Sequence, residues 1–480
     1  MSSRSARTDR VSGVLLGLAA GDALGAGYEF TTPAPDAEIA MLGGGQFAWE
    51  PGEWTDDTQL AVCIAEVTAT GEVDVNAIAQ RFLDWYAGGP KDVGVQTRSV
   101  LGRAGGHADR LADVAAEHFA ANPRGAAGNG SLMRTAPIAL AHLGDDDAIA
   151  AAAMAVSGLT HGDPLAGEAC VLWCIAIDRG VREARLDGID DGLALLPADR
   201  RGFWSQRITE ARTRPPATFT PNGFVVTALQ AALAAITQTP IPDDAPWRHL
   251  PLALEAAVRI GHDTDTVAAI AGGLLGARWG GSALPFAWRR LLHGWPGYRA
   301  RDLVRLAVLT AGRGRPDDAG WPSADSLAGY YQHAGHPTFA VALPDDPGLV
   351  VGNVAGLPAA DIDAVVSLCR VGRTFAPPDV EHLELHFIDT PGANTHLRHV
   401  VADTAAGILA LREEGKRVFL HCVAGQSRTP AVAAAYLRLR LGISGKEALG
   451  RIGDVLYHYQ HNHELIDVVR SLPQQRDSNS

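Results

Sequence analysis

Residues 418–430 read VFLHCVAGQSRTP, and this stretch decides the fold of the C-terminal part of the chain. The apolar run at 417–421 predicts a strand, the glycine-containing segment after it predicts a loop, and the pattern from about residue 429 predicts a helix. Short runs rich in Val, Leu and Phe, such as AVVSLC and LELHFID, alternate with helical patterns before it. Strands that alternate with helices predict an α/β domain, which we place at residues 335–475.

The loop in this stretch carries Cys422 and Arg428, separated by five residues. A loop between a strand and a helix N-terminus brings backbone N–H groups to one point, where they favour an oxyanion. Gly425 permits the tight curvature, and Arg428 can bind a phosphate with two hydrogen bonds. The same positive field favours the thiolate form of Cys422, which is a nucleophile. The alternative, a buried cysteine beside a surface arginine, leaves the agreement of spacing, glycine, strand and helix unexplained.

Departure of an alcohol from a phosphate ester needs a proton donor. Upstream of the cysteine loop, HFIDTPGANTH places Asp389 at the end of a predicted strand, followed by Thr390 and Asn394. An isolated aspartate at a strand end is most often a turn residue. Together with the cysteine loop, Asp389 is the expected general acid.

Residues 8–312 differ from this pattern, because they are rich in Ala and Leu with helical periodicity. Segments such as DTQLAVCIAEVTATG and NGFVVTALQAALAAITQT read as helices separated by Gly, Pro or Asp turns. This region therefore predicts an all-α domain. The stretch GRGRPDDAGWPSADS that follows is rich in Gly, Pro, Asp and Ser, and it predicts a linker, which we place at 313–334.

The overall composition indicates in which cell compartment the protein works and which kinds of partner it binds. The net charge is −13, so a basic face for nucleic acid is not expected. The five cysteines are scattered without zinc-type pairs, which favours a reducing compartment. The apolar stretch near the N-terminus, VLLGLAAGDALGAGYEF, is interrupted by Asp22 and is typical of neither a signal peptide nor a membrane span. We expect a cytoplasmic protein without a membrane partner.

Two acidic clusters in the all-α region, WTDDTQLAV and GHDTDTVAAIAGG, each open a predicted helix. Either cluster could be a helix cap, since Asp and Thr oxygens accept the free N–H groups there. A cap needs one oxygen, however, and several carboxylates packed together are costly without a cation. Oxygen ligands without His or Cys suit Mg²⁺ or Mn²⁺. The candidate ligands are Thr55, Asp56, Asp57, Asp263, Asp265 and Thr266.

Four further segments add candidate residues to these clusters. A glycine-rich loop lets backbone N–H groups approach a pyrophosphate, although such a loop is more often a flexible connection. The lone histidine and the lone aspartate among them are equally ambiguous by themselves. These candidates are Asp22 and Glu29 in GDALGAGYEF, Asp92 in KDVGVQT, Gly125, Gly128, Asn129 and Gly130 in RGAAGNGSLMR, and His161 in THGDP.

These motifs together, in this order over residues 8–312, resemble the ADP-ribosylglycohydrolase family. The resemblance implies an all-α orthogonal bundle and a hydrolase in which the two acidic clusters hold two Mg²⁺ ions, with Mn²⁺ as an option. It implies that Glu29 lies on the metal or on a flap over it, and that the loop at 124–130 binds ADP-ribose together with His161. Asp92 would face the ribose or the scissile bond, and Asp56, Asp92 or Glu29 would act as acid or base. His262 departs from the small residue of many relatives, which leaves the acceptor open.

The C-terminal motifs resemble dual-specificity protein phosphatases over residues of about 337–475. The segment from His421 to Thr429 is similar to the family signature HCxxGxSRS, and DTPGAN is similar to the acid loop D-T-x-x-x-N. By this resemblance Cys422 forms a phosphocysteine, Arg428 binds phosphate, Asp389 protonates the leaving oxygen, and Thr429 helps the thiolate leave. Pro430 after the threonine departs from the signature.

Both sets of residues look complete, so the sequence predicts a bifunctional hydrolase. Its substrates would be an ADP-ribosylated protein or ADP-ribose derivative and a phosphorylated molecule. The two activities could act on one small molecule, such as ADP-ribose 1″-phosphate, or on one protein that carries both modifications. The first alternative is a phosphatase whose N-terminal domain binds ADP-ribosylated partners without cleaving them. The second is a non-enzymatic interaction protein, which would leave both sets of residues unexplained.

Overall fold

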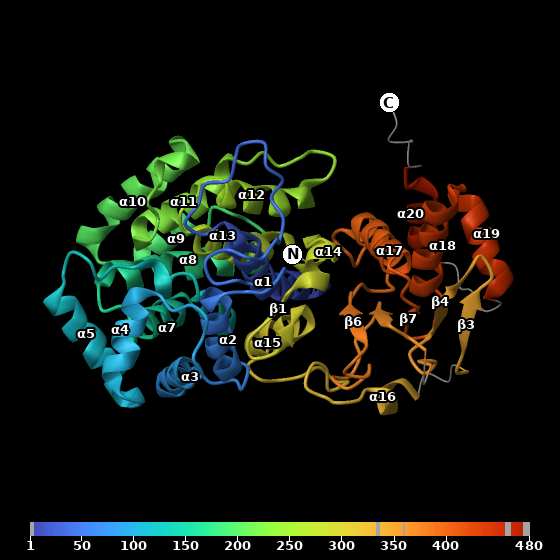
Figure 1. Cartoon of the computed structure of the whole chain (residues 1–480), viewed down its shortest axis with the longest axis horizontal. Helices are drawn as coiled ribbons and strands as arrows, with labels where there is room; N and C mark the ends of the chain where they lie inside the picture. The colour runs from blue at the N-terminus through green and yellow to red at the C-terminus, as the bar shows by residue number, and fades with distance from the viewer. Residues whose placement is uncertain (1–3, 333–336, 359–360, 457–461, 474–480) are drawn as a thin grey trace. The chain divides into compact units, whose positions relative to one another are not determined.

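The computed structural model describes residues 4–332, 337–358, 361–456 and 462–473. The chain divides into two compact units (Figure 1). The first unit comprises Met1–Leu284 and Trp288–Arg315, and the second comprises Pro285–Ala287 and Pro316–Ser480.

The first unit is built from helices, which confirms the predicted all-α region. Its regular strands among the described residues are a short hairpin of β1 (His293–Gly294) and β2 (Tyr298–Arg299). Helix α14 is Phe286–Leu291, and the division of the chain into units falls within its sequence, between Ala287 and Trp288. The other helices are α1 (Arg4–Gly25), α2 (Asp56–Thr68), α3 (Val75–Ala87), α4 (Val95–Ala104), α5 (Leu111–Ala121), α6 (Ala136–Ala141), α7 (Asp146–Gly158), α8 (Pro164–Glu183), α9 (Ile189–Gly192), α10 (Ala198–Thr213), α11 (Val225–Gln238), α12 (His249–Val258), α13 (Thr264–Trp279) and α15 (Ala300–Ala311).

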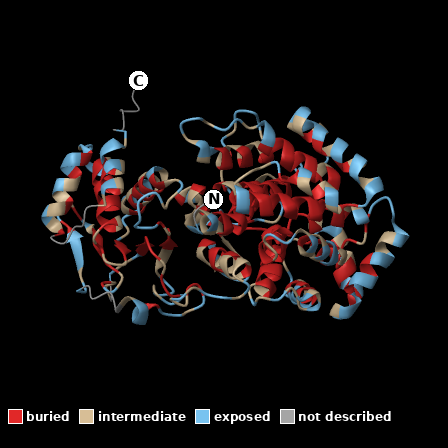
Figure 2. Cartoon of the chain, turned by 180° about the vertical axis from the view of Figure 1, so that it is seen from behind, coloured by how far each residue is buried: buried red, intermediate tan, exposed pale blue. Residues whose placement is uncertain are grey.

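Helices α1 and α13 pack with their backbones in contact at the centre of the first unit, where buried residues concentrate (Figure 2). A side-chain Cβ at Gly17 would overlap the carbonyl oxygen of Gly272, and one at Gly21 would overlap that of Ala268. Small residues four apart on one helix face allow this approach. Helix α1 is long and apolar enough, by length and composition alone, to cross a membrane, yet 83% of its apolar stretch is buried inside the protein. The close packing brings the C-terminal end of α1 to the N-terminal end of α13.

The second unit contains a five-stranded sheet in the order β3-β4-β7-β5-β6, which confirms the predicted α/β architecture. Strand β3 pairs antiparallel with β4, and the other pairs are parallel. The strands are β3 (Ala340–Leu343), β4 (Asp346–Asn353), β5 (Ala364–Ser367), β6 (Glu381–Glu384) and β7 (Val418–Cys422). The helices are α16 (Ala328–Gln332), α17 (Leu397–Glu413), α18 (Arg428–Leu441), α19 (Gly445–Val455) and α20 (His463–Ser471).

Neighbouring residues of the central strand β7 face opposite sides of the sheet, as the pleat requires. Leu420 belongs to the larger core cluster, which includes apolar residues of α17 and α18. Phe419 belongs to a smaller cluster with Val350 and Val365. Because β7 is buried on both faces, its carboxyl end holds the loop that follows Cys422 at a fixed place.

Residues 316–332, within the segment predicted as a linker, group with the second unit. The side chains of Trp321 and Leu327 are buried. The carboxylates of Asp317 and Asp325 each lie 2.6 Å from an arginine of this unit, Arg370 and Arg373 respectively. This part of the segment is therefore anchored to the second unit.

Candidate active sites

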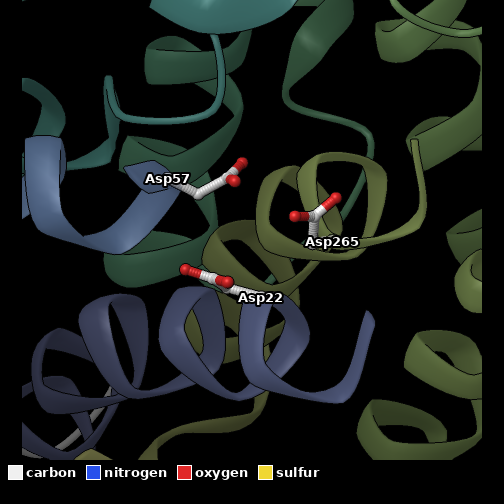
Figure 3. A group of neighbouring side chains, drawn as sticks. All are labelled: Asp22, Asp57 and Asp265. Atoms are coloured by element: carbon white, nitrogen blue, oxygen red, sulfur yellow. The ribbon is translucent and has the colours of Figure 1, made fainter. Parts of the chain in front are cut away.

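Three helices of the first unit bring three buried carboxylates together. Asp22 comes from α1, Asp57 from α2 and Asp265 from α13, and they point into one space (Figure 3). One oxygen from each lies within 4.8 Å of the others. Glu29, Asp263 and Asp265 form a second group by the same measure, so Asp265 joins both groups. The two acidic clusters of the sequence thus meet in space, together with Asp22, which the sequence-based ligand set omits.

Helix α2 begins at this site because two residues cap it. The Oγ1 atom of Thr55 accepts a hydrogen bond from the backbone N–H of Asp57 at 3.4 Å and donates to Asp57 Oδ2 at 2.8 Å. The carboxylate of Asp22 accepts from the backbone N–H groups of Thr55, at 2.9 Å, and Thr58, at 3.0 Å. The helix-cap explanation therefore holds for Thr55 and Asp22. It does not account for the carboxylates that remain.

Two carboxylate oxygens in the groups are buried without a hydrogen-bond partner among the described residues, Asp57 Oδ1 and Glu29 Oε2. Burial raises the pKa of Asp22 to about 6 and, with help from the charges of Asp263 and Asp92, that of Glu29 to about 9. Burial also raises the pKa of Asp57 and Asp265 well above the ordinary value. Crowded, unpaired oxygen donors of this kind fit a divalent cation, which would compensate their charge.

Asp56 and Asp92 lie beside these groups. The backbone N–H of Gly94 donates to Asp56 Oδ2 at 3.4 Å. Burial raises the pKa of Asp56, and the charge of Asp92 is the next cause. Burial raises the pKa of Asp92 as well. Thr266 donates its backbone N–H to Asp265 Oδ1 at 3.0 Å, so it lies next to the ligand candidates.

The glycine-rich loop packs against His161. A Cβ at Gly130 would lie 3.1 Å from His161 Cε1, and a Cβ at Gly128 would lie 3.3 Å from His161 Nε2, so both positions favour glycine. Burial lowers the pKa of His161 well below its ordinary value, which keeps the imidazole neutral. Gly125 is exposed, and its nearest side chain is that of Asn122. The structure therefore joins three of the predicted binding residues and leaves Gly125 outside.

Asn129, predicted to bind ADP-ribose, turns its amide toward the acidic groups. Its Nδ2 donates to Asp263 Oδ2 at 2.7 Å and to the carbonyl oxygen of Asn222 at 3.1 Å. Asn222 is fully buried, and the sequence-based set omits it. The sequence predicts Asn222 as the first residue of the helix NGFVVTALQAALAAITQT, but α11 begins at Val225 and Asn222 lies in the loop before it. The sequence therefore gives no sign of this role.

In the second unit, Cys422 ends β7 and Arg428 begins α18. Gly425 between them has φ +70°, and a Cβ there would lie 2.5 Å from Phe339 Cζ, so the loop requires glycine. Arg428 Nη1 donates to the carbonyl oxygens of Leu368, at 2.9 Å, and Phe387, at 3.0 Å. These bonds fix the guanidinium beside the cysteine loop.

Asp389 lies over this loop. Its Oδ1 accepts from Ser427 Oγ at 2.7 Å and from Asn462 Nδ2 at 2.8 Å, and its Oδ2 lies 3.9 Å from Arg428 Nε. Asn394 stabilises the acid loop, because its side-chain amide forms hydrogen bonds with both the backbone N–H and the backbone carbonyl oxygen of Ile388. Thr429 Oγ1 is buried without a partner among the described residues. The structure thus brings together all five candidates of the second site: Cys422, Gly425, Arg428, Thr429 and Asp389.

The sequence model of the ADP-ribosylglycohydrolase family matches residues 3–317. The chain belongs to this family. ADP-ribosylarginine hydrolase Tri1 of Pseudomonas putida (strain GB-1) is 32% identical over 291 residues, which are 58% of this chain and 73% of the relative. A solved structure titled "ADP-ribosylglycohydrolase-related protein complex" is 30% identical, covers 64% of this chain and 99% of its own, and has a TM-score of 0.53. Human DUSP28 is 22% identical, covers 28% of this chain and 90% of its own, and has a TM-score of 0.25.

The family confirms the resemblance predicted for residues 8–312 and gives the first unit its activity, hydrolysis of ADP-ribosylated substrates. Members of the ADP-ribosylglycohydrolase family generally depend on a divalent metal, and the clustered carboxylates fit one. Asp22, Glu29, Asp57, Asp263 and Asp265 are the residues that would hold it.

Proposed function

We propose that the first unit is a Mg²⁺-dependent hydrolase that releases ADP-ribose from modified arginine. The observation that supports this most is the convergence of five carboxylates from distant parts of the chain, some with unpaired buried oxygens. Five oxygen donors without His or Cys suit Mg²⁺, with Mn²⁺ as a replacement. The arginine acceptor comes from the relative Tri1, which is an ADP-ribosylarginine hydrolase.

The reaction breaks the bond between ribose C1″ and the acceptor nitrogen through an oxocarbenium-like state. Bound Mg²⁺ would orient the ribose hydroxyls and activate the attacking water. Asp56 and Asp92 are the two carboxyl groups beside the acidic groups, and burial raises the pKa of both, with the charge of Asp92 as the next cause for Asp56. Two interacting carboxyls favour one protonated and one ionised group, which are the acid and the base. The acid donates its proton to the leaving nitrogen, the base takes a proton from water, and the water oxygen bonds to C1″.

The test is release of free ADP-ribose from an ADP-ribosylarginine protein by the full chain, with Mg²⁺ and with EDTA. Asp263→Asn removes one carboxylate charge from the second group and should abolish release in Mg²⁺. Asp190→Asn is the matched control, because Asp190 forms an exposed ion pair with Arg212, and such pairs contribute little to stability. Release that continues in EDTA, or in Asp263→Asn, would contradict the proposed metal site.

A second function rests on the cysteine loop. We propose that the second unit hydrolyses phosphate monoesters. The Cys422 thiolate attacks phosphorus, the bond to the leaving oxygen breaks, and Asp389 gives that oxygen its proton. Water then attacks the phosphocysteine, Asp389 takes a proton from it, and the Thr429 hydroxyl donates a hydrogen bond to the departing thiolate. The anchored Arg428 and the hydrogen-bonded Asp389 support this assignment.

Phosphate release from p-nitrophenyl phosphate tests it. Cys422→Ser should abolish release, whereas Cys63→Ser, which changes a buried thiol of the first unit, should leave it intact. Equal phosphate release by both variants would contradict the proposed phosphatase activity of the second unit. Binding of ADP-ribose without its release, with phosphatase activity intact, would favour the alternative in which the first unit only recognises ADP-ribosylated partners.

We further propose that both activities serve one cytoplasmic pathway. An equimolar mixture of Cys422→Ser and Asp263→Asn chains separates the two activities between molecules. If one substrate is passed between the units of one chain, the mixture should convert a doubly modified substrate more slowly than wild-type chains at matched site concentrations. Equal rates would leave the shared-substrate idea without support.

A further inference from the structure

Asn222 lies in the loop before α11, with its side chain fully buried. Its Nδ2 donates to the carbonyl oxygen of Gly261 at 3.1 Å, and its Oδ1 accepts from the backbone N–H of Asp263 at 2.9 Å. One side-chain amide thereby binds a backbone group on each side of His262. This arrangement is a clamp on the segment that carries Asp263 into the acidic groups.

The clamped residue has an unusual backbone. His262 has φ +66°, a left-handed conformation that is unfavourable for a residue with a Cβ. Such a conformation persists where the surroundings over-determine it. Besides the bonds of Asn222 to its neighbours, the N–H of His262 donates to Thr31 O at 2.8 Å, and its carbonyl oxygen accepts from Phe30 N at 2.6 Å. The same backbone therefore also fixes the segment that directly follows Glu29.

The glycine-rich loop completes the connection. Asn129 Nδ2 donates both to the backbone carbonyl oxygen of Asn222 and to Asp263 Oδ2, and Asn129 N donates to Gly223 O at 3.1 Å. Three segments distant in sequence thus meet around Asn222. They carry the glycine loop, Asp263 and Glu29.

We propose that Asn222 is a positioning residue that fixes Asp263 and Glu29 relative to each other, so that both converge with Asp265 on one divalent cation. Asn222 acts through the backbone and not as a ligand itself. This inference rests on the proposed metal-dependent reaction. A residue that only stabilised the turn at 221–223 would change stability without changing the affinity for a cation, which makes the two roles separable.

The test measures Mn²⁺ binding to the full chain by calorimetric titration, together with kcat and KM for ADP-ribose release. Loss of a group that orients a ligand typically weakens metal affinity by about 10–100-fold. Asn222→Ala should therefore raise the Kd for Mn²⁺ by roughly tenfold or more, and kcat at a fixed subsaturating Mn²⁺ concentration should fall and recover as Mn²⁺ is raised. That recovery is a response that a purely structural defect would not show.

Asn353 in the second unit provides a matched control. Its amide forms the same type of clamp, donating to Pro337 O at 2.8 Å and accepting from Phe339 N at 3.4 Å. Asn353→Ala removes an equivalent pair of bonds away from the acidic groups. Its Mn²⁺ affinity should equal that of the wild type.

The outcomes are distinct. A wild-type chain that binds no Mn²⁺ would remove the proposed metal site and this inference with it. A wild type that binds Mn²⁺, with unchanged affinity in folded Asn222→Ala, would overturn the positioning role alone. If Asn222→Ala does not fold, Asn222→Ser keeps a small polar side chain whose single hydroxyl cannot bond to both the Gly261 carbonyl oxygen and the Asp263 N–H. A folded Asn222→Ser chain should also raise the Kd for Mn²⁺ by roughly tenfold, and an unchanged Kd in it would refute the inference.

Discussion

The substitution Gly25→Ala tests how the packing of α1 on α13 sets the acidic site. Gly25 ends α1, three residues after Asp22. A Cβ at this position would lie 2.5 Å from both the Cα and the N atom of Asp265, whereas ordinary contact begins at 3.4 Å. The start of α13 therefore has to move by about 1 Å to admit one methyl group. The carboxylate of Asp265, which belongs to both groups, moves with it.

The overlap at Gly25 should lower both the stability of the first unit and its activity. Overpacking of this kind costs about 1–3 kcal/mol, and alanine in place of glycine in a helix regains up to about 1 kcal/mol. With the full 1 kcal/mol regained, the net loss is about 0–2 kcal/mol, which lowers the Tm of the first unit by at most roughly 3 °C. Misplacement of catalytic geometry by about 1 Å costs on the order of a hundredfold in rate. Activity should therefore fall far more than stability.

The assay compares Tm and ADP-ribose release in Mg²⁺ for two variants. Gly158→Ala is the control, because Gly158 also ends its helix, α7, and a Cβ there meets no atom within 4 Å. The control should keep its activity, and its Tm should be equal to or slightly above that of the wild type. If Gly25→Ala matches Gly158→Ala in activity, then the close approach of α1 and α13 does not set the geometry of the acidic site, and the reasoning is refuted.

Two further predictions concern the charges of the two sites. Because burial raises the pKa of Asp22 to about 6 and that of Glu29 to about 9, the folded state without metal binds more protons than the unfolded state, and its stability should fall as pH rises from about 4 to about 9. Thermal unfolding in EDTA at pH 5, 7 and 9 checks this, Mg²⁺ should reverse the loss, and a flat profile in EDTA would contradict it. Asn462→Ala removes a hydrogen bond to the acid Asp389, so it should slow hydrolysis of phenyl phosphate more than that of p-nitrophenyl phosphate, whose leaving group needs less protonation. Equal slowing would indicate a structural effect on the loop.

The α/β fold of the second unit was predicted well from the sequence, because strands and helices produce patterns in short local stretches of residues. The strand predicted at 417–421 is β7 (Val418–Cys422), one residue later, and the helix predicted from about 429 begins at Arg428. Strand β3 was not predicted, since AVAL has no alternation and the strand forms by pairing with β4 at the edge of the sheet. The loop residues were identifiable because one short segment contains most of them.

The acidic site was predictable only in part, because its members come from distant helices. Asp57 and Asp265 stand in clusters of oxygen donors, and that density is visible in the sequence. Asp22 stands alone in an apolar helix, and its place at the site depends on how α1 packs against α13. Asn222 contacts backbone groups some forty residues further along, a relation that no local pattern encodes.

The same distinction explains why the segment before the sheet is not a free connection. Its Gly, Pro, Asp and Ser content correctly indicates turns rather than helix or strand. Composition says nothing about tertiary partners, however, and Trp321 is buried with Arg370 positioned 4.6 Å from its ring centroid. Arg370 also bonds to Asp317, and Tyr331 donates to the carbonyl oxygen of Arg370. Arg370, which follows β5, therefore contacts three residues of the segment that precedes the sheet and holds that segment against the second unit.

The two sites meet opposite electrostatic demands within one acidic chain. The first brings carboxylates from three helices close together, an arrangement that fits a divalent cation. The second holds Arg428 by two backbone carbonyl groups, which leaves its positive charge uncompensated by any full charge closer than Asp389 Oδ2 at 3.9 Å among the described residues. In the reaction that we propose, Asp389 carries the proton for the leaving oxygen, so its charge would not oppose the incoming phosphate. The 3.9 Å approach of Asp389 to Arg428 is therefore compatible with the phosphate binding that we propose.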